Sequence, residues 1–168
     1  TTRTRITGIL TKGEDQFVFL DTPGVIKARN KLGDYMVKTV SNTIGEVDAC
    51  LFVVEAGVKP GPTDLSIVER IKSRRLPAIL VINKTDRPDS RIAQVVSETT
   101  DLLLSLAEDV MAEGVEVDID KLCSLPVLYA CAKAGRADTV RPKDGQMPAN
   151  EDLEPLFAAL VNEIPAPT

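Results

Sequence analysis

The stretch that decides the fold is AILVINKTD, residues 78–86, in which an apolar run ends in a polar loop. The apolar part shows no alternation with polar residues, which is typical of a parallel strand covered on both faces. In an open α/β sheet, ligands bind just beyond the carboxyl ends of such strands. We therefore expect Asn83, Lys84 and Asp86 to lie at a binding site.

The chemistry of this polar loop suits guanine. The carboxylate of Asp86 can accept both the ring N–H and the exocyclic amino group of guanine, a charge-assisted pair that adenine does not offer. Such pairing can reject a wrong base by roughly 10⁴-fold, because the polar groups of the site would be left unpaired. Asn83 is expected to bond neighbouring backbone and the base edge, and the stem of Lys84 to lie over the ring. Taken alone, these residues also fit a polar loop that only caps a strand.

Composition indicates one globular domain. The chain has 168 residues, of which 43% are apolar and 27% charged, as in ordinary soluble proteins. No apolar run reaches the roughly 18 residues of a membrane span and the start does not resemble a signal peptide, so we expect a cytoplasmic protein. Three cysteines and no histidine disfavour a disulfide framework and a zinc site. A metal, if bound, is expected to be a hard ion on oxygen ligands.

Strand and helix patterns alternate along the chain and predict an α/β fold. Strands are expected over residues 3–11, 16–20, 50–54, 77–82 and 126–132, and helices over 32–47, 63–75, 90–111 and 150–164. Thr63 and Asn150 are the expected caps of two of these helices, and residues 136–150 are expected to form a surface loop. This order predicts a parallel sheet with one antiparallel edge strand from the opening hairpin.

Polar loops follow three of these strands and resemble the DxxG, NKxD and SAK motifs of P-loop GTPases. They are residues 21–24, 83–86 and 131–133. The DxxG motif alone is weak evidence for a GTPase. A nucleotide-independent α/β domain, the alternative, would need all three motifs to occur together by chance. The resemblance implies a Ras-like G domain that binds GTP or GDP with Mg²⁺ and hydrolyses GTP. It assigns nucleotide binding to Asp21, Gly24, Asn83, Lys84, Asp86, Cys131, Ala132 and Lys133, and the metal to Thr2 and Asp21.

Residues 1–86 resemble the Era family of GTPases from its switch I onward. The resemblance implies that Thr2 ligates Mg²⁺ and senses the γ-phosphate, that Asp21 holds the Mg²⁺ shell, and that the N–H of Gly24 approaches the γ-phosphate. Val25 stands where Ras-like enzymes place a water-orienting glutamine. Hydrolysis would then depend on positioning and metal electrostatics, and no catalytic residue is assigned.

Residues 87–168 resemble a second family, the G domain of TypA/BipA. The likeness lies in Arg87-Pro88, in the segment 95–101, in the strand and loop 129–135, and in residues 151–157. We interpret residues 1–168 as a single partial G domain whose Era-like front meets a TypA-like back near residue 86. Net charge changes from positive to negative at the same place. Both families imply the ribosome or ribosomal RNA as partner, and a natural recombinant, an assembly artefact and a deliberate chimera fit the join equally.

The phosphate-binding string GxxxxGK followed by Ser or Thr does not occur among the 168 residues. In both families it precedes the position that matches residue 1, and it supplies the backbone N–H groups and lysine that hold the phosphates. We therefore expect an incomplete P-loop GTPase fold that lacks the first strand and the P-loop. Two interpretations follow. The chain is a GTP-binding partial G domain, or it is a hydrolytically inactive interaction module that self-associates through an open sheet.

Overall fold

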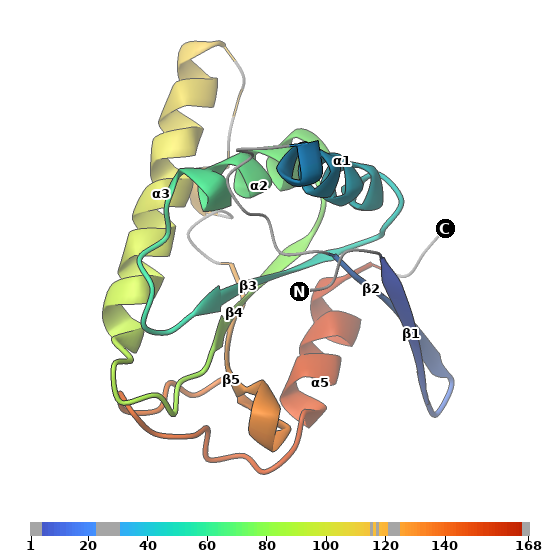
Figure 1. The fold of residues 1–168 in the computed structure, drawn as a ribbon, viewed down its shortest axis with the longest axis vertical. Helices are drawn as coiled ribbons and strands as arrows, with labels where there is room; N and C mark the ends of the chain where they lie inside the picture. The colour runs from blue at the N-terminus through green and yellow to red at the C-terminus, as the bar shows by residue number, and fades with distance from the viewer. Residues whose placement is uncertain (1–4, 23–30, 115, 117, 121–124, 166–168) are drawn as a thin grey trace. The chain divides into compact units, whose positions relative to one another are not determined.

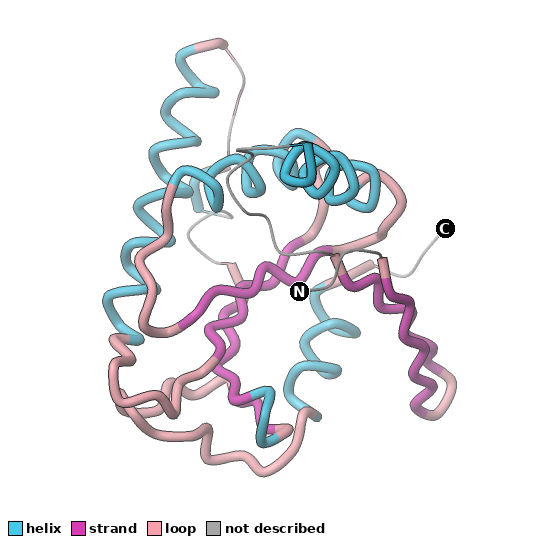
Figure 2. Tube along the Cα trace, viewed as in Figure 1, coloured by secondary structure: helices cyan, strands magenta, loops and turns pink. Residues whose placement is uncertain are grey.

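A computed structural model describes residues 5–22, 31–114, 116, 118–120 and 125–165, with some side chains of the first helix excepted. The chain divides into two compact units, residues 1–47 and residues 48–168. The join inferred from the two family resemblances, near residue 86, falls inside the second unit. Figures 1 and 2 trace the elements along the chain.

The first unit holds a β-hairpin and a helix: β1 (Ile6–Lys12), β2 (Asp15–Asp21) and α1 (Lys31–Ile44). Gly13 has a φ of +62°, a left-handed conformation that glycine adopts without steric cost, and this closes the turn between the strands. Phe17 and Phe19 lie on one face of β2 with ring centroids 6.1 Å apart. The predicted hairpin is therefore confirmed.

The second unit is built on a four-stranded sheet in the order β3-β4-β5-β6. Its strands are β3 (Cys50–Glu55), β4 (Ala78–Asn83), β5 (Val127–Cys131) and β6 (Arg136–Asp138). The first three are parallel and β6 is antiparallel to β5. The helices are α2 (Pro62–Ser73), α3 (Ile92–Ala112), the 3-10 turn η1 (Ala132–Ala134) and α5 (Glu154–Glu163). The predicted α/β class with a mostly parallel sheet is confirmed.

The antiparallel edge strand has a different origin from the one expected. The opening hairpin forms a two-stranded sheet of its own, and the antiparallel strand of the larger sheet is β6, in the stretch predicted to be a loop. Gly135 has a φ of +66° and reverses the chain directly after η1. Arg136 then pairs with Cys131, and Asp138 with Tyr129. A strand of three residues has too few positions for a period-2 pattern, so the sequence did not indicate it.

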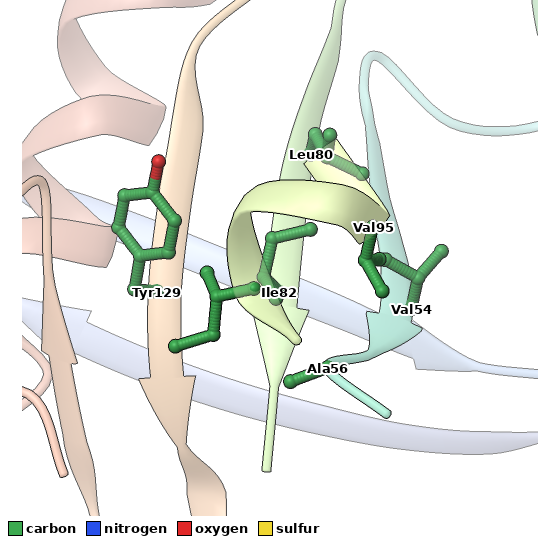
Figure 3. Packing of buried hydrophobic residues seen from close by; sticks show 7 residues of the cluster. Val54, Ala56, Leu80, Ile82, Val95 and Tyr129 are labelled. Atoms are coloured by element: carbon green, nitrogen blue, oxygen red, sulfur yellow. The ribbon is translucent and has the colours of Figure 1, made fainter. Parts of the chain in front are cut away.

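The core of the second unit lies around β4, which is paired on both sides. Its residues from Ile79 to Ile82 are all buried, as the unbroken apolar run predicted. Helix α3 packs Ile92 and Val95 against β3 and β4, and both side chains are wholly buried. Figure 3 shows Val95 among the strand residues of this cluster. The core therefore fixes the direction in which β4 leaves the sheet.

Two helix caps differ from the predicted ones. Helix α2 begins at Pro62 with Gly61 as its N-cap, not Thr63, because proline fixes a helical φ and needs no hydrogen-bond partner for its nitrogen. The carboxylate of Asp64 accepts the N–H of Gly61 at 2.8 Å. Helix α5 begins at Glu154, so Asn150 is not its cap.

Helix α3 is close to its predicted length. It runs from Ile92 to Ala112, where residues 90–111 were expected. Within the described residues, none of the helices is both long enough and apolar enough to cross a membrane.

Replacing Val95 with alanine tests how far the second unit depends on this core. We expect Val95→Ala to lower the free energy of unfolding by about 2 kcal/mol, because it removes wholly buried methyl groups and leaves a cavity. Val161→Ala is the matched control, since Val161 also lies on a helix but is 49% exposed, and we expect a change within about 0.5 kcal/mol. Urea unfolding followed by circular dichroism measures both. Equal losses would contradict the assigned packing.

Candidate functional site

Strand β4 delivers the loop of residues 83–86 through a sharp change of backbone direction. Lys84 has a φ of +62°, a left-handed conformation that is uncommon for residues other than glycine. Thr85 is wholly buried, and its N–H donates to the carbonyl of Ala130 at 3.3 Å. Because Thr85 is anchored inward, the side chain of Lys84 is exposed and that of Asp86 is half-buried.

The loop after β4 meets the loop after β5. The side-chain oxygen of Asn83 accepts the N–H of Ala132 at 3.1 Å. Cys131 is buried, and burial raises the pKa of its thiol, as does the negative charge of the Asp86 carboxylate. The thiol is therefore neutral near pH 7. The structure thus brings together Asn83, Asp86, Cys131 and Ala132, while Lys84 and Lys133 lie on the same loops with exposed side chains.

Glu55 joins this site although the sequence did not single it out. It is the last residue of β3 and stands in register with Asn83 on the neighbouring strand. Its carboxylate lies 2.6 Å from the Nζ of Lys84 and 3.5 Å from a guanidinium nitrogen of Arg87. Exposed pairs of this kind contribute only about 0–1 kcal/mol to stability. Their consequence is orientation, because Glu55 holds the Lys84 side chain toward β3.

Arg87 is also paired with Asp89 in the same turn. Two hydrogen bonds of 2.8 Å join the guanidinium to the carboxylate. These hydrogen bonds and the opposite charges raise the pKa of Arg87 and lower the pKa of Asp89. The turn that follows the loop of residues 83–86 therefore contains a bidentate ion pair between Arg87 and Asp89. Arginine forms this geometry and lysine does not.

The loop after β3 packs closely on the turn after β4. The N–H of Ala56 donates to the carbonyl of Asn83 at 2.9 Å, and the N–H of Arg91 donates to the carbonyl of Ala56 at 2.8 Å. A Cβ added at Gly57 would lie 3.1 Å from the backbone oxygen of Asp89. A side chain at residue 57 would therefore be in tight contact with this turn, and the polar loop is supported from the β3 side as well.

The residues assigned to phosphate and metal are less completely described. Asp21 is the last residue of β2, in the first unit. Thr2, Gly24 and Val25 lie outside the described residues. In the described part of the chain, no group of three His, Cys, Asp or Glu side chains could hold a metal ion. The magnesium site at Thr2 and Asp21 stays a prediction.

The first 84 residues identify the family. A sequence profile of the family described as 50S ribosome-binding GTPase matches residues 1–84, which is half of the chain. The chain belongs to this GTPase family. GTPase Era of Alkaliphilus metalliredigens strain QYMF is 40% identical over 121 residues, covering 70% of this chain and 41% of the relative. The Era resemblance inferred from the loop motifs is therefore confirmed.

Solved structures show the same fold as this chain. One is an Era protein in complex with MgGDPNP and nucleotides 1506–1542 of 16S ribosomal RNA, with a TM-score of 0.65 and 23% identity. Another is the elongation factor SelB of Methanococcus maripaludis, with a TM-score of 0.64 and 16% identity. The alignment with the Era protein covers 100% of this chain and 47% of that chain. The alignment with SelB covers 99% of this chain and 30% of that chain. The chain thus spans less than half the length of each relative named.

Asn83 can be tested as the link between the two loops. We expect Asn83→Ala to speed hydrogen exchange of the Ala132 amide by roughly fivefold to tenfold, because that N–H loses its acceptor. Asn83→Asp is the matched control, since it keeps an oxygen at the same position, and exchange there should stay near the wild-type rate. The measurement is amide exchange by mass spectrometry on peptides that cover residues 127–136. Unchanged exchange in Asn83→Ala would show that the side chain does not hold the loop.

Proposed function

We propose that this chain is the guanine-recognising part of a ribosome-associated GTPase of the Era type. The observation that carries the proposal is the meeting of two loops, in which the Asn83 side chain holds the backbone of Ala132 and Asp86 lies beside Cys131. Membership in the ribosome-binding GTPase family supports the proposal. One solved neighbour of the same fold is an Era protein that binds MgGDPNP and a segment of 16S ribosomal RNA.

The donors and acceptors of the two loops fit guanine. In the proposed complex, Asp86 accepts the ring N–H and the exocyclic amino group of the base. Backbone N–H groups of residues 131–133 donate hydrogen bonds to the guanine oxygen, and the aliphatic stem of Lys84 lies along the ring. Glu55 keeps the ammonium of Lys84 at the side of the site. Half-burial of Asp86 leaves its carboxylate accessible to a base while limiting competition from water.

Phosphate and Mg²⁺ are proposed to involve the front of the chain. Thr2 and Asp21 would hold the metal, and the N–H of Gly24 would approach the γ-phosphate. Bound Mg²⁺ supplies neutralisation of the charge that develops on the phosphoryl oxygens. Val25 offers no group to orient water, so the proposed hydrolysis depends on placement.

Several finer assignments stay proposals. Residues 87–168 are proposed to be TypA/BipA-like, joined near residue 86 to the Era-like front in one partial G domain. The 121-residue match to the Alkaliphilus Era protein is longer than the 86-residue front, which favours the Era type for part of the back as well. Action in ribosome assembly or translation, contact with ribosomal RNA and a cytoplasmic location are likewise proposed from family membership.

A second candidate function is an inactive interaction module. The observation that favours it is that, among the described residues, β3 lies at one edge of the four-stranded sheet, with Val53 at 55% exposed. An unpaired strand edge is a template for pairing with another chain. Light scattering and a GTP turnover assay distinguish the two functions. Self-association through this edge predicts a dimer in the absence of nucleotide. A monomer that hydrolyses GTP would exclude the interaction module.

The proposed base recognition is tested by exchanging the carboxylate of Asp86 for an amide. Millimolar GDP should raise the melting temperature of the wild-type chain. Xanthosine diphosphate (XDP) should raise the melting temperature less than GDP does. Asp86→Asn should weaken GDP binding on the order of 10²-fold or more and shift preference toward XDP, because the amide complements the xanthine oxygen.

Asp101→Asn on the exposed face of α3 is the control for this experiment and should retain the preference for GDP. Thermal shift and nucleotide titration give both quantities. If neither GDP nor GTP shifts the melting temperature of the wild-type chain at millimolar concentration, nucleotide binding by this chain is rejected.

A further inference from the structure

The segment of residues 136–150, which we name the return segment, links the two recognition loops through a second route. It begins at residue 136, separated by two residues from the loop 131–133, and reaches the amino end of α3, which follows the loop 83–86. Figure 1 shows this orange to red part of the chain running to the lower end of α3. The carboxylate of Asp144 accepts the N–H of Ile92 at 2.7 Å, and the N–H of Gly145 donates to the hydroxyl of Ser90 at 2.6 Å.

Asp144 supplies the cap that α3 lacks in its own sequence. The N-cap position is held by Arg91, whose side chain makes no capping bond, and the first turn of α3 contains no acidic residue. The leading N–H groups of a helix need acceptors, and a negative charge there complements the helix dipole. Ile92, which donates to Asp144, is wholly buried. The start of this 21-residue helix therefore takes its acceptor from a residue 52 positions away.

The return segment is held in place on both sides of Asp144. Both carboxylate oxygens of Asp138 accept backbone N–H groups, from Val140 at 3.0 Å and from Asn150 at 3.2 Å. The side-chain amide of Asn150 donates to the carbonyl of Ala137 at 3.0 Å. Pro148 is among the fully buried residues.

The path from Asp86 to α3 is short and consists of consecutive turns. The N–H of Arg87 donates to the carbonyl of Lys84 at 3.2 Å, and the N–H of Ser90 donates to the carbonyl of Arg87 at 3.0 Å. One end of this path is held to β5 by Thr85, and the other end is held by the return segment at Ser90. These two consecutive turns connect Ser90 to Asp86.

We propose that Asp144 and Ser90 are positioning residues that hold the guanine-reading loop in its binding shape without contacting the base. This inference rests on the proposed function for its consequence in nucleotide affinity, and on the contacts of Asp144 and Ser90 for its structural part. A site that is already held in its binding shape loses less conformational freedom when it binds. The return segment therefore raises affinity for the nucleotide through the shape of the loop.

The test compares Asp144→Ala, Asp144→Asn and the control Gln146→Ala in the full chain. Gln146 is exposed and lies two residues from Asp144. Amide hydrogen exchange of residues 84–92 is measured without nucleotide. We expect Asp144→Ala to speed exchange there by about fivefold to tenfold, as for the loss of a helix cap. Asp144→Asn keeps an acceptor oxygen and should recover most of the protection, and Gln146→Ala should match the wild type.

A GDP titration of the same variants separates positioning from stability. We expect Asp144→Ala to raise the Kd for GDP by about fivefold to tenfold, since the cap contributes an effect of that size, while the preference for GDP over XDP is retained. Unchanged exchange at residues 84–92, equal acceleration throughout residues 48–165, or faster exchange with an unchanged Kd would each overturn the inference. If the wild-type chain does not bind GDP, the proposed function fails, and the exchange result alone decides whether the return segment holds the loop.

Discussion

The burial of β4 between two parallel neighbours is the constraint on which the rest of the second unit depends. Four successive apolar residues, Ile79 to Ile82, are buried, so both faces of the strand are covered. A one-residue shift of register would turn every one of these side chains to the opposite face. The point at which Asn83 leaves the sheet is therefore fixed by packing. The polar loop of residues 83–86 therefore starts from a fixed position. A loop on a flexible segment would not be held in this way.

Polar contacts then convert this fixed strand end into a site. Asn83 reaches across to Ala132, Thr85 is buried against Ala130, and Asp86 lies beside the neutral thiol of Cys131. Each contact joins the end of β4 or its loop to the end of β5 or the residue that follows it, between residues more than 40 positions apart in sequence. Backbone bonds from Ala56 add support from the β3 side. The two loops thus lie next to each other at one edge of the sheet.

Much of the second unit could be predicted from the sequence because its signals are local. The unbroken apolar run of β4 predicted a doubly covered strand, and the apolar stripe of α3 predicted a helix within one or two residues of its observed ends. The polar residues 83–86 were predicted to follow a strand ending at residue 82, and β4 ends one residue later, at Asn83. The caps at Thr63 and Asn150 were wrong, because Pro62 and the contacts of Asn150 with β6 compete with simple capping rules.

The sequence by itself determined the order of strands and helices, the buried character of β4 and the loop chemistry that indicates guanine. Only the tertiary structure decided that β6 closes the sheet, that Glu55 takes the ammonium of Lys84, and that Asp144 caps α3. The physical reason is that periodicity and turn chemistry act between residues close in sequence. A hydrogen bond between Asp144 and Ile92 depends on where Gly135 reverses the chain and on how the return segment packs, and no local pattern encodes it.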